Sequence, residues 1–299
     1  MATNNSINGA TKITTYIASD TWTKDPRSQY IEVYMWGSGG AGGSGRRGAS
    51  AASGGGSGGA PGDVMFISAP ASVFGSTQTV TIGGTVTGAS GQTSDNTNGL
   101  AVAGSVPFSL FGTYTTNQAL NANGPGGING SASIGSSGIF TSKFSGSGIA
   151  GPVAGGGGNA NGGTPATLNS QSPFATGGGG ASGANSVTPQ QAARGGNLAL
   201  STNTSTIILT GGAGGIESGT INGSQGTIPN TTSANGYLSG GAGGGGGGGQ
   251  STGLVAGNGA AGRTPAGGGG GGGGSLNTFT SGSGGDGARG QVIVIEFLS

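Results

Sequence analysis

Cysteine and histidine are both absent from this chain of 299 residues. Without cysteine there is no disulfide framework and no thiolate metal site, and without histidine the commonest catalytic base and metal ligand is missing. Charged residues are also scarce, at 6% against about 25% in typical soluble domains. These absences argue against an enzyme and against a cofactor-dependent protein, so we expect neither catalysis nor a cofactor.

Clustered charge and long hydrophobic runs are missing as well. The net charge is +1, and the basic residues are scattered except for the pair Arg46 and Arg47. A nucleic-acid partner would need a basic patch, so nucleic acid is not expected. No apolar run approaches the length that spans a bilayer, and the N-terminus lacks the basic-then-apolar pattern of a signal peptide. We therefore expect synthesis in a cytoplasm and no membrane insertion.

Two motifs resemble ligand sites, but each lacks the context that its chemistry needs. The stretch "GSGGAG" (37–42) matches the dinucleotide pattern G-x-G-x-x-G, yet the glycine-rich residues after it cannot sustain the helix that must follow. None of the three lysines follows a phosphate-binding glycine loop. The stretch "GSGGDGARG" (282–290) resembles half a turn of a calcium-binding β-roll, but the whole chain has only five aspartates. We predict no catalytic, cofactor-binding or metal-binding residues.

Glycine is what the chain has in abundance, with 78 residues that include runs of seven at 243–249 and eight at 267–274. Each interior glycine costs a helix roughly 1 kcal/mol relative to alanine, which excludes long helices. Shorter glycine segments recur along the chain without a fixed period, unlike collagen or a solenoid repeat.

Two interpretations of the glycine segments compete. They are either disordered linkers or a bundle of extended polyglycine helices, each with about three residues per turn and no internal hydrogen bonds. In a bundle, neighbouring segments satisfy the backbone groups, and the missing Cβ lets them approach closely. We favour the bundle because strand-like runs are interleaved with the glycines and no second folded domain is left to be tethered. The two long runs suit its centre.

Strand-like alternation of apolar and polar residues is clearest at the two ends of the chain. Residues 11–24 and 29–37 flank the turn-forming pair Asp25-Pro26 and predict a hairpin. We expect the apolar run at 291–299 to join them in one sheet, because an unpaired edge there would invite aggregation. Further strands are predicted within 63–84 and at 205–212.

The predicted architecture is a single glycine-rich domain over residues 1–299, mainly β and irregular with essentially no α-helix. Residues 1–84 and 285–299 are expected to form a small β-sheet or sandwich base. Residues 85–284 are expected to form the polyglycine bundle and its loops.

Aromatic residues in the middle of the chain lie between the glycine runs rather than within them. One interpretation is structural, with these side chains covering the ends and faces of the bundle, and the other makes some of them an exposed recognition patch. The candidate loops are 106–117, 139–144 and 227–238. The candidate receptor contacts within them are Phe108, Phe111, Tyr114, Phe144 and Tyr237.

Several segments taken together resemble the glycine-rich domain of tailed-bacteriophage tail-fibre and adhesin proteins. They are "DTWTK" (20–24), "YIEVYMWGSGGAGG" (30–43), "GGAPGDVMF" (58–66), "QTVTIGG" (78–84) and "GDGARGQVIVIEF" (285–297). Residues 85–200 depart from the pattern, with longer Ser/Thr/Asn segments and few glycine runs. The resemblance implies a virion surface fibre or adhesin, in which polyglycine helices form a rigid scaffold and connecting loops touch the host cell.

The resemblance also implies the partners, which are other virion proteins and a host cell-surface receptor, and it is compatible with a homotrimer. We therefore expect a structural protein of the virion surface that is made in the host cytoplasm. The alternative is a purely structural glycine-rich protein, such as a head decoration or a cell-surface matrix component, without a receptor. An ice-binding bundle would need a flat regular face, which the irregular glycine spacing disfavours. Binding to whole host cells distinguishes the first two.

Overall fold

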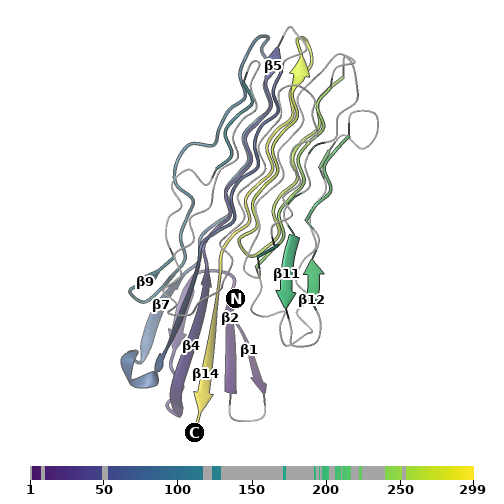
Figure 1. Ribbon diagram of the computed structural model, residues 1–299. Coiled ribbons are helices and arrows are strands. Elements are labelled where there is room, and N and C mark those ends of the chain that lie inside the picture. The colour runs from purple at the N-terminus through teal and green to yellow at the C-terminus, as the bar shows by residue number, and fades with distance from the viewer. Residues whose placement is uncertain are drawn as a thin grey trace.

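The computed structural model describes residues 2–7, 11–48, 53–116, 123–128, 171–172, 192, 195, 197–201, 206–209, 211–216, 222–223, 240–250 and 254–299. This part of the chain is mainly β and has no α-helix. The two largest sheets occupy one end of the molecule, and extended segments run away from them to the other end (Figure 1). The elements are β1 (Ala2–Ile7), β2 (Thr11–Tyr16), β3 (Asp20–Thr23), β4 (Ser28–Trp36), β5 (Arg47–Gly48), β6 (Val64–Pro70), the 3-10 helix η1 (Ala71–Val73), β7 (Thr77–Thr81), β8 (Leu110–Phe111), β9 (Tyr114–Thr115), β10 (Gln171–Ser172), β11 (Asn197–Ser201), β12 (Thr206–Leu209), β13 (Ser275–Leu276) and β14 (Gln291–Leu298).

An antiparallel five-stranded sheet with the order β1-β2-β14-β4-β6 joins the two ends of the chain. Val292 of β14 lies opposite Tyr16 on one side and Met35 on the other, so the prediction that the C-terminal run joins the N-terminal strands is confirmed. The strands predicted within 63–84 and at 205–212 are confirmed as well, as β6, β7 and β12.

The predicted hairpin between residues 11–24 and 29–37 is wrong. β14 lies between β2 and β4, and β3 crosses to a second sheet, where it pairs with β7. The reason is burial, because Val292, Ile293 and Val294 are all inaccessible to solvent and a strand that is apolar on both faces belongs at the centre of a sheet. A hairpin would leave this strand at an edge.

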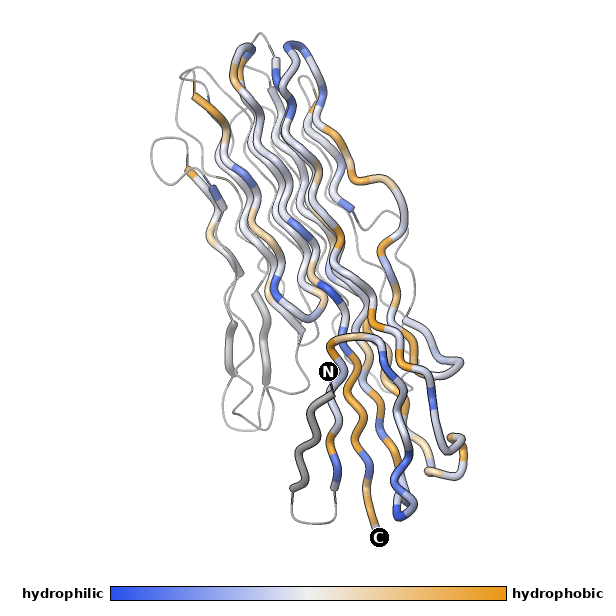
Figure 2. Tube along the Cα trace, turned by 180° about the vertical axis from the view of Figure 1, so that it is seen from behind, coloured by the Kyte–Doolittle hydropathy of each residue, from blue (hydrophilic) through white to orange (hydrophobic). Residues whose placement is uncertain are grey.

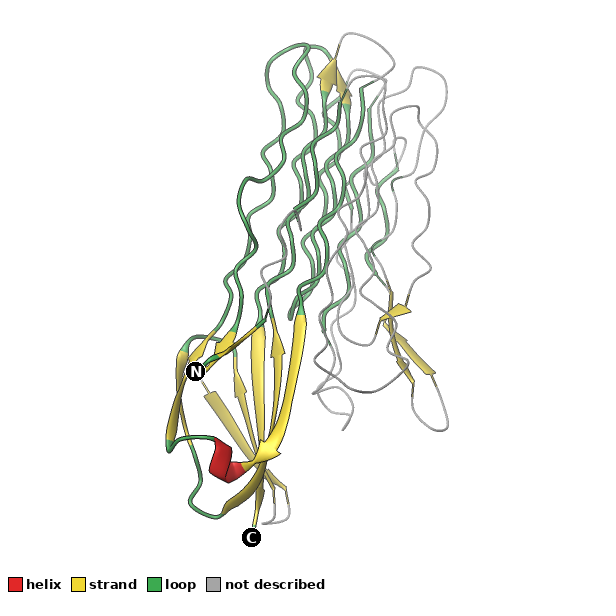
Figure 3. Cartoon of the chain, turned by 60° about the vertical axis from the view of Figure 1, so that its left-hand side comes forward, coloured by secondary structure: helices red, strands yellow, loops and turns green. Residues whose placement is uncertain are grey.

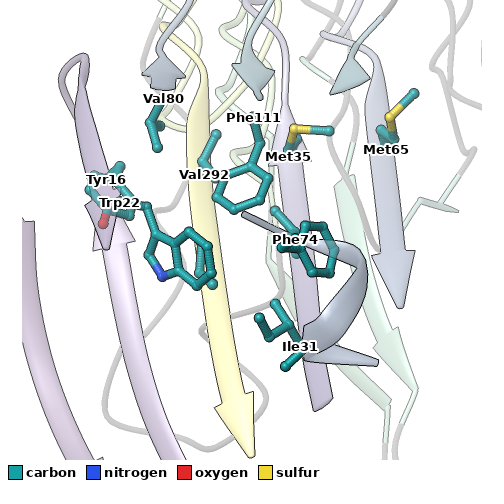
Figure 4. Packing of buried hydrophobic residues seen from close by; sticks show 12 residues of the cluster. Tyr16, Trp22, Ile31, Met35, Met65, Phe74, Val80, Phe111 and Val292 are labelled. Carbon is teal, nitrogen blue, oxygen red and sulfur yellow. The ribbon is translucent and has the colours of Figure 1, made fainter. Parts of the chain in front are cut away.

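The second sheet has the order β3-β7-β8-β9 and packs over one face of the five-stranded sheet (Figure 3). Its Trp22 contacts Phe111 and Phe74, with ring centroids 5.3 and 6.4 Å apart, inside the shared core (Figure 4). We call these two sheets the base. The buried core of the base comprises Tyr16, Trp22, Ile31, Val33, Met35, Met65, Ala71, Phe74, Val80, Phe111, Val292 and Val294.

A buried carboxylate fixes the loop between β3 and β4. Glu296 of β14 is inaccessible to solvent, and its Oε1 accepts hydrogen bonds from the Asp25 amide at 2.7 Å and from Ser28 Oγ at 2.8 Å. Its Oε2 lies 3.1 Å from Lys12 Nζ and accepts a bond from Trp22 Nε1 at 3.4 Å. Both carboxylate oxygens of Glu296 therefore have partners, as a buried charged group requires.

The glycine-rich segments run side by side from the base, and backbone hydrogen bonds join them (Figures 1 and 3). We call this part of the molecule the array. In residues 37–46, every third amide donates to the same neighbouring segment: 37, 40, 43 and 46 donate to the carbonyls of 63, 60, 57 and 54. The next set, 39, 42 and 45, donates to the carbonyls of 288, 285 and 282. Successive residues thus face different neighbours, with a repeat of three.

The eight-glycine run 267–274 lies inside the array and is buried along its whole length. Amides of this run and of Ser275 donate to segments 40–46 and 257–263. Carbonyls of Ala266 and the run accept from segments 241–250, 56–62 and 282–288. Five segments therefore surround it, and their backbones take the place that side chains fill in an ordinary core.

Close approach explains why these positions are glycine. At each residue from 269 to 274, a Cβ atom would lie 2.0 to 2.2 Å from a backbone oxygen of a neighbouring segment. Real Cβ contacts essentially never fall below 3.0 Å. No side chain fits at these positions while the segments keep their hydrogen bonds.

The division of the chain between base and array differs from the predicted boundary at residue 84. Residues 37–46 and 53–62 hydrogen-bond within the array, although they precede that boundary. Residues 110–115 return to the base as β8 and β9. Figure 2 shows that hydrophobic residues gather in the strands of the base, whereas the array has intermediate hydropathy.

Candidate functional site

The array ends in loops on the side away from the base, where β5 and β13 lie (Figure 1). We call this end the tip and define it by the described residues 46–48, 93–98, 254–255 and 275–280. Residues 46–48 and 275–277 are joined by the parallel pairing of β5 with β13. An antiparallel bridge between Arg47 and Thr97 adds the third loop.

Large aliphatic side chains are exposed on the tip. Leu254 is 60% and Val255 54% accessible, and they follow the seven-glycine run where the chain turns back. Close to the tip, Leu100, Ile128 and Ile216 are exposed as well. Single exposed apolar residues are common, but two adjacent exposed aliphatic residues on a loop are typical of a contact surface.

An ion pair ties the tip loops to one another. Arg47 Nε donates to Asp95 Oδ1 at 2.7 Å, Arg47 Nη2 lies 2.6 Å from the same oxygen, and Arg47 Nη1 donates to the Thr93 carbonyl. The Thr278 amide donates to the same Asp95 oxygen at 2.8 Å. The Thr278 amide and then the Arg47 guanidinium hold the pKa of Asp95 below its usual value, so its charged form is favoured.

Two buried polar atoms near the tip have no hydrogen-bond partner among the described residues. They are Arg46 Nε and Ser53 Oγ, and the Ser53 side chain is 1% exposed. Another atom of the Arg46 guanidinium, Nη1, donates to Asn98 Oδ1. Buried polar groups without a hydrogen-bond partner lower the free energy of unfolding, so these two atoms destabilise the fold locally.

Three of the residues predicted to contact a receptor are described by the structure, and these three do not lie at the tip. Phe111 is inaccessible to solvent in the core of the base, so the prediction for this residue is wrong. Tyr114 is half-buried against Phe74, with ring centroids 6.3 Å apart, and Phe108 is half-buried just before β8. The candidates Phe144 and Tyr237, with loops 139–144 and 227–238, lie outside the described residues.

Sequence reasoning missed Leu254 and Val255 because it followed the aromatic residues. The available signal was the stretch "GLVAG" (253–257), in which two adjacent large aliphatic residues interrupt a glycine-rich region. Phe111 was misassigned because β8 has only two residues, and its burial depends on pairing with the distant strand β7.

The dinucleotide-like motif at 37–42 forms part of the array and not a phosphate loop. No helix follows it within the described residues 43–48 and 53–62, and Cβ atoms at Gly39 and Gly42 would lie 2.2 and 2.0 Å from the carbonyl oxygens of Gly267 and Gly270. Within the described part of the chain, no group of three Asp, Glu, His or Cys residues is placed to hold a metal ion. No described helix is long and apolar enough to cross a membrane.

Comparison with known proteins gives no family for this chain, since no protein-family model matches the sequence and no curated protein matches it. The functional assignment therefore depends on the base, the array and the tip.

Proposed function

We propose that this chain is a structural protein on the surface of a tailed-bacteriophage virion, a tail fibre or adhesin that recognises a host-cell receptor through the tip. In this proposal the base attaches to other virion proteins and the array is a rigid spacer. The exposed aliphatic pair Leu254 and Val255, at the end farthest from the base, is the observation that carries the proposal.

The spacer is proposed to be a bundle of polyglycine II helices. A polyglycine II helix has three residues per turn, so a given face recurs at every third residue. The hydrogen bonds of segments 37–46, 241–250 and 281–290 each advance along a neighbour in steps of three residues, which supports this assignment. Bonds to several neighbours at once resist bending and sliding, so such a bundle can hold loops in a fixed position.

The tip is proposed as the receptor contact because its exposed apolar side chains raise the free energy of the unbound protein. Leu254 and Val255 keep apolar surface in water, although burial of an aliphatic side chain is worth roughly 1.5–3 kcal/mol. A partner surface can recover that free energy. A purely structural protein has no use for this exposure, which is why we prefer the adhesin over the structural alternative.

A matched pair of substitutions tests the proposal. Val255 at the tip is 54% exposed and Val73 in η1 of the base is 58% exposed, so serine at either position changes little in the fold. Labelled wild-type protein is incubated with a panel of bacterial strains to find those that bind it. Val255→Ser should weaken binding to those strains, and Val73→Ser should leave it unchanged.

Two results would count against the proposal. Equal binding by wild type and Val255→Ser, combined with weak binding by Val73→Ser, would move recognition to the base. Absence of wild-type binding to every strain would favour the purely structural alternative.

A further inference from the structure

Three loops from distant parts of the chain meet at Asp95. Its Oδ1 accepts a hydrogen bond from Arg47 Nε and forms an ion pair with Arg47 Nη2, both in the loop at 46–48, and it accepts a hydrogen bond from the Thr278 amide in the loop at 275–280. Asp95 itself belongs to the loop at 93–98. One carboxylate oxygen therefore connects all three loops, through charge-assisted hydrogen bonds of 2.7 and 2.8 Å and an ion pair of 2.6 Å.

A second set of contacts connects the same loops through Asn277. Its Oδ1 accepts a bond from the Asn96 amide at 3.1 Å, and its Nδ2 donates to Asn96 Oδ1 at 3.4 Å. Its own amide donates to the Gly48 carbonyl at 2.9 Å. We call the residues Arg47, Asp95, Asn96, Asn277 and Thr278 the clasp.

Two residues of the clasp, Asn96 and Thr278, adopt left-handed backbone, which is rare for threonine. Asn96 has φ 57° and Thr278 has φ 71°, and left-handed backbone in a β-branched residue such as threonine is a genuine outlier. Such conformations persist only where the surroundings hold them, and they gather at ligand contacts and switches. The clasp supplies that restraint at both residues, through the bond from the Asn96 amide to Asn277 and the bond from the Thr278 amide to Asp95.

The clasp adjoins the loop that presents the exposed aliphatic pair. Gln250, just before that loop, forms a parallel bridge with Ser275, and the Ala256 amide, just after it, donates to the Thr280 carbonyl at 3.1 Å. The loop at 275–280 therefore contacts the chain both before and after Leu254 and Val255, at Gln250 and at Ala256. The array does not need this clasp, because its segments are already joined by their own backbone bonds.

We infer that Asp95 is a positioning residue for recognition: through Arg47 and Thr278 it fixes the loop at 275–280, which holds Leu254 and Val255 in the arrangement that the receptor contacts. This inference rests on the proposed function. Restricting a loop to its bound arrangement raises affinity because less freedom is lost on binding. Weakening the clasp should therefore lower affinity without disturbing the base or the array.

The test compares Asp95→Asn with Asp25→Asn. Asp25 also pairs with an arginine, since Arg27 Nη2 lies 3.1 Å from its Oδ2, but this pair is in the base. Amide exchange and affinity for a strain that binds the wild type are measured for both variants and for Arg47→Ala. We expect faster exchange at 275–280, unchanged exchange at 267–274, and an affinity at least about tenfold lower for Asp95→Asn and Arg47→Ala, but wild-type behaviour for Asp25→Asn.

A double variant separates positioning from a direct contact. If Asp95 and Arg47 act through each other, Arg47→Ala combined with Asp95→Asn should bind no more weakly than either single variant. Wild-type affinity in Asp95→Asn, or unchanged exchange at 275–280, would overturn the inference and leave the proposed function standing. Failure of the wild type itself to bind any strain would refute both.

Discussion

Substitution of a central glycine by alanine probes the array most sharply. A Cβ at Gly271 would lie 2.0 Å from the Gly56 carbonyl oxygen and 2.5 Å from its carbon. To reach 3.0 Å, the segment containing Gly56 has to retreat by at least 1.0 Å. The bonds from the amides of Gly56 and Gly59 to the carbonyls of Gly272 and Gly269, now 2.8 Å long, would then stretch beyond hydrogen-bonding distance.

The cost follows from these two effects. Overpacking costs about 1–3 kcal/mol, and each of two buried hydrogen bonds left unmade costs about 1–3 kcal/mol, so Gly271→Ala should lower the free energy of unfolding by about 3–9 kcal/mol. Gly84→Ala is the matched control, because no atom lies within 4 Å of its added Cβ. A compatible Gly→Ala change instead stabilises by about 0.4–1 kcal/mol through the unfolded state.

The assay is urea unfolding of both variants and the wild type, followed by circular dichroism. If Gly271→Ala is as stable as Gly84→Ala, segment 267–274 is not packed against residues 53–62, and the reasoning from close approach is refuted.

Four further predictions concern the base and the tip. Phe111→Ser should lower the free energy of unfolding by at least about 3 kcal/mol, because it empties part of the buried core; a loss below 1 kcal/mol in urea unfolding would contradict the assigned burial. Glu296→Ala should cost at least about 2 kcal/mol in the same assay by leaving buried donors unpaired, and an unchanged midpoint would contradict this. Ser53→Ala should stabilise by about 1 kcal/mol, since it removes a buried hydroxyl that has no partner among the described residues, whereas a destabilised variant would show that the hydroxyl has a partner. Hydrogen bonds from Arg27 lower the pKa of Asp25 from 3.8 to about 2, so the pair stabilises the fold above pH 3.8 and this contribution disappears as the pH falls through 2. An NMR titration of the Asp25 carboxyl should give this pKa, with a return toward 3.8 in Arg27→Ala; a wild-type value near 3.8 would contradict the pairing.

The base was largely predictable because its strands carry strong local signals. Alternation and β-branched residues marked β4, β6, β7 and β14, and the apolar C-terminal run needed partners. The strand order was not predictable from the turn at Asp25-Pro26. Both β3 and β4 flank this turn, yet each pairs with strands far away in the sequence, and such long-range choices depend on how the whole core packs.

The period of the glycine segments was present in the sequence but hidden by their irregular spacing. Within one segment, Ser38, Ala41 and Ser44 recur at every third position. Their amides donate to Pro107 O, Asn123 Oδ1 and Leu100 O, on the side where side chains have room. The two glycines between successive members of this set face the segments that approach most closely, 54–63 and 282–288. Segment lengths differ because they are set by the loops, so no period extends along the whole chain.

Some amides of the array donate to side-chain oxygens, which composition cannot reveal, and Asn123 is one example. Its Oδ1 accepts the Ala41 amide at 2.9 Å, in the place where the flanking bonds use backbone carbonyls. Asp286 Oδ1 accepts the Gly88 amide at 2.8 Å, and Ser283 Oγ accepts the Gly91 amide at 3.0 Å. Polar side chains thus complete the hydrogen bonds of the array, and so they need not indicate a binding site.

The tip could not be located from the sequence, because exposure of Leu254 and Val255 depends on where the array ends. Adjacent aliphatic residues in a chain usually predict a strand or a core position. Here the seven-glycine run before them and the segment at 256–263 after them both form hydrogen bonds within the array. The turn between the two segments can therefore expose its side chains.

Amide hydrogen exchange of residues 267–274 tests the central claim most directly, because it reports the hydrogen bonds themselves. With five surrounding segments, we predict protection in this run comparable to that of β4 and β14. Exchange at random-coil rates, while β4 and β14 stay protected, would mean that the glycines are linkers and that the array does not exist.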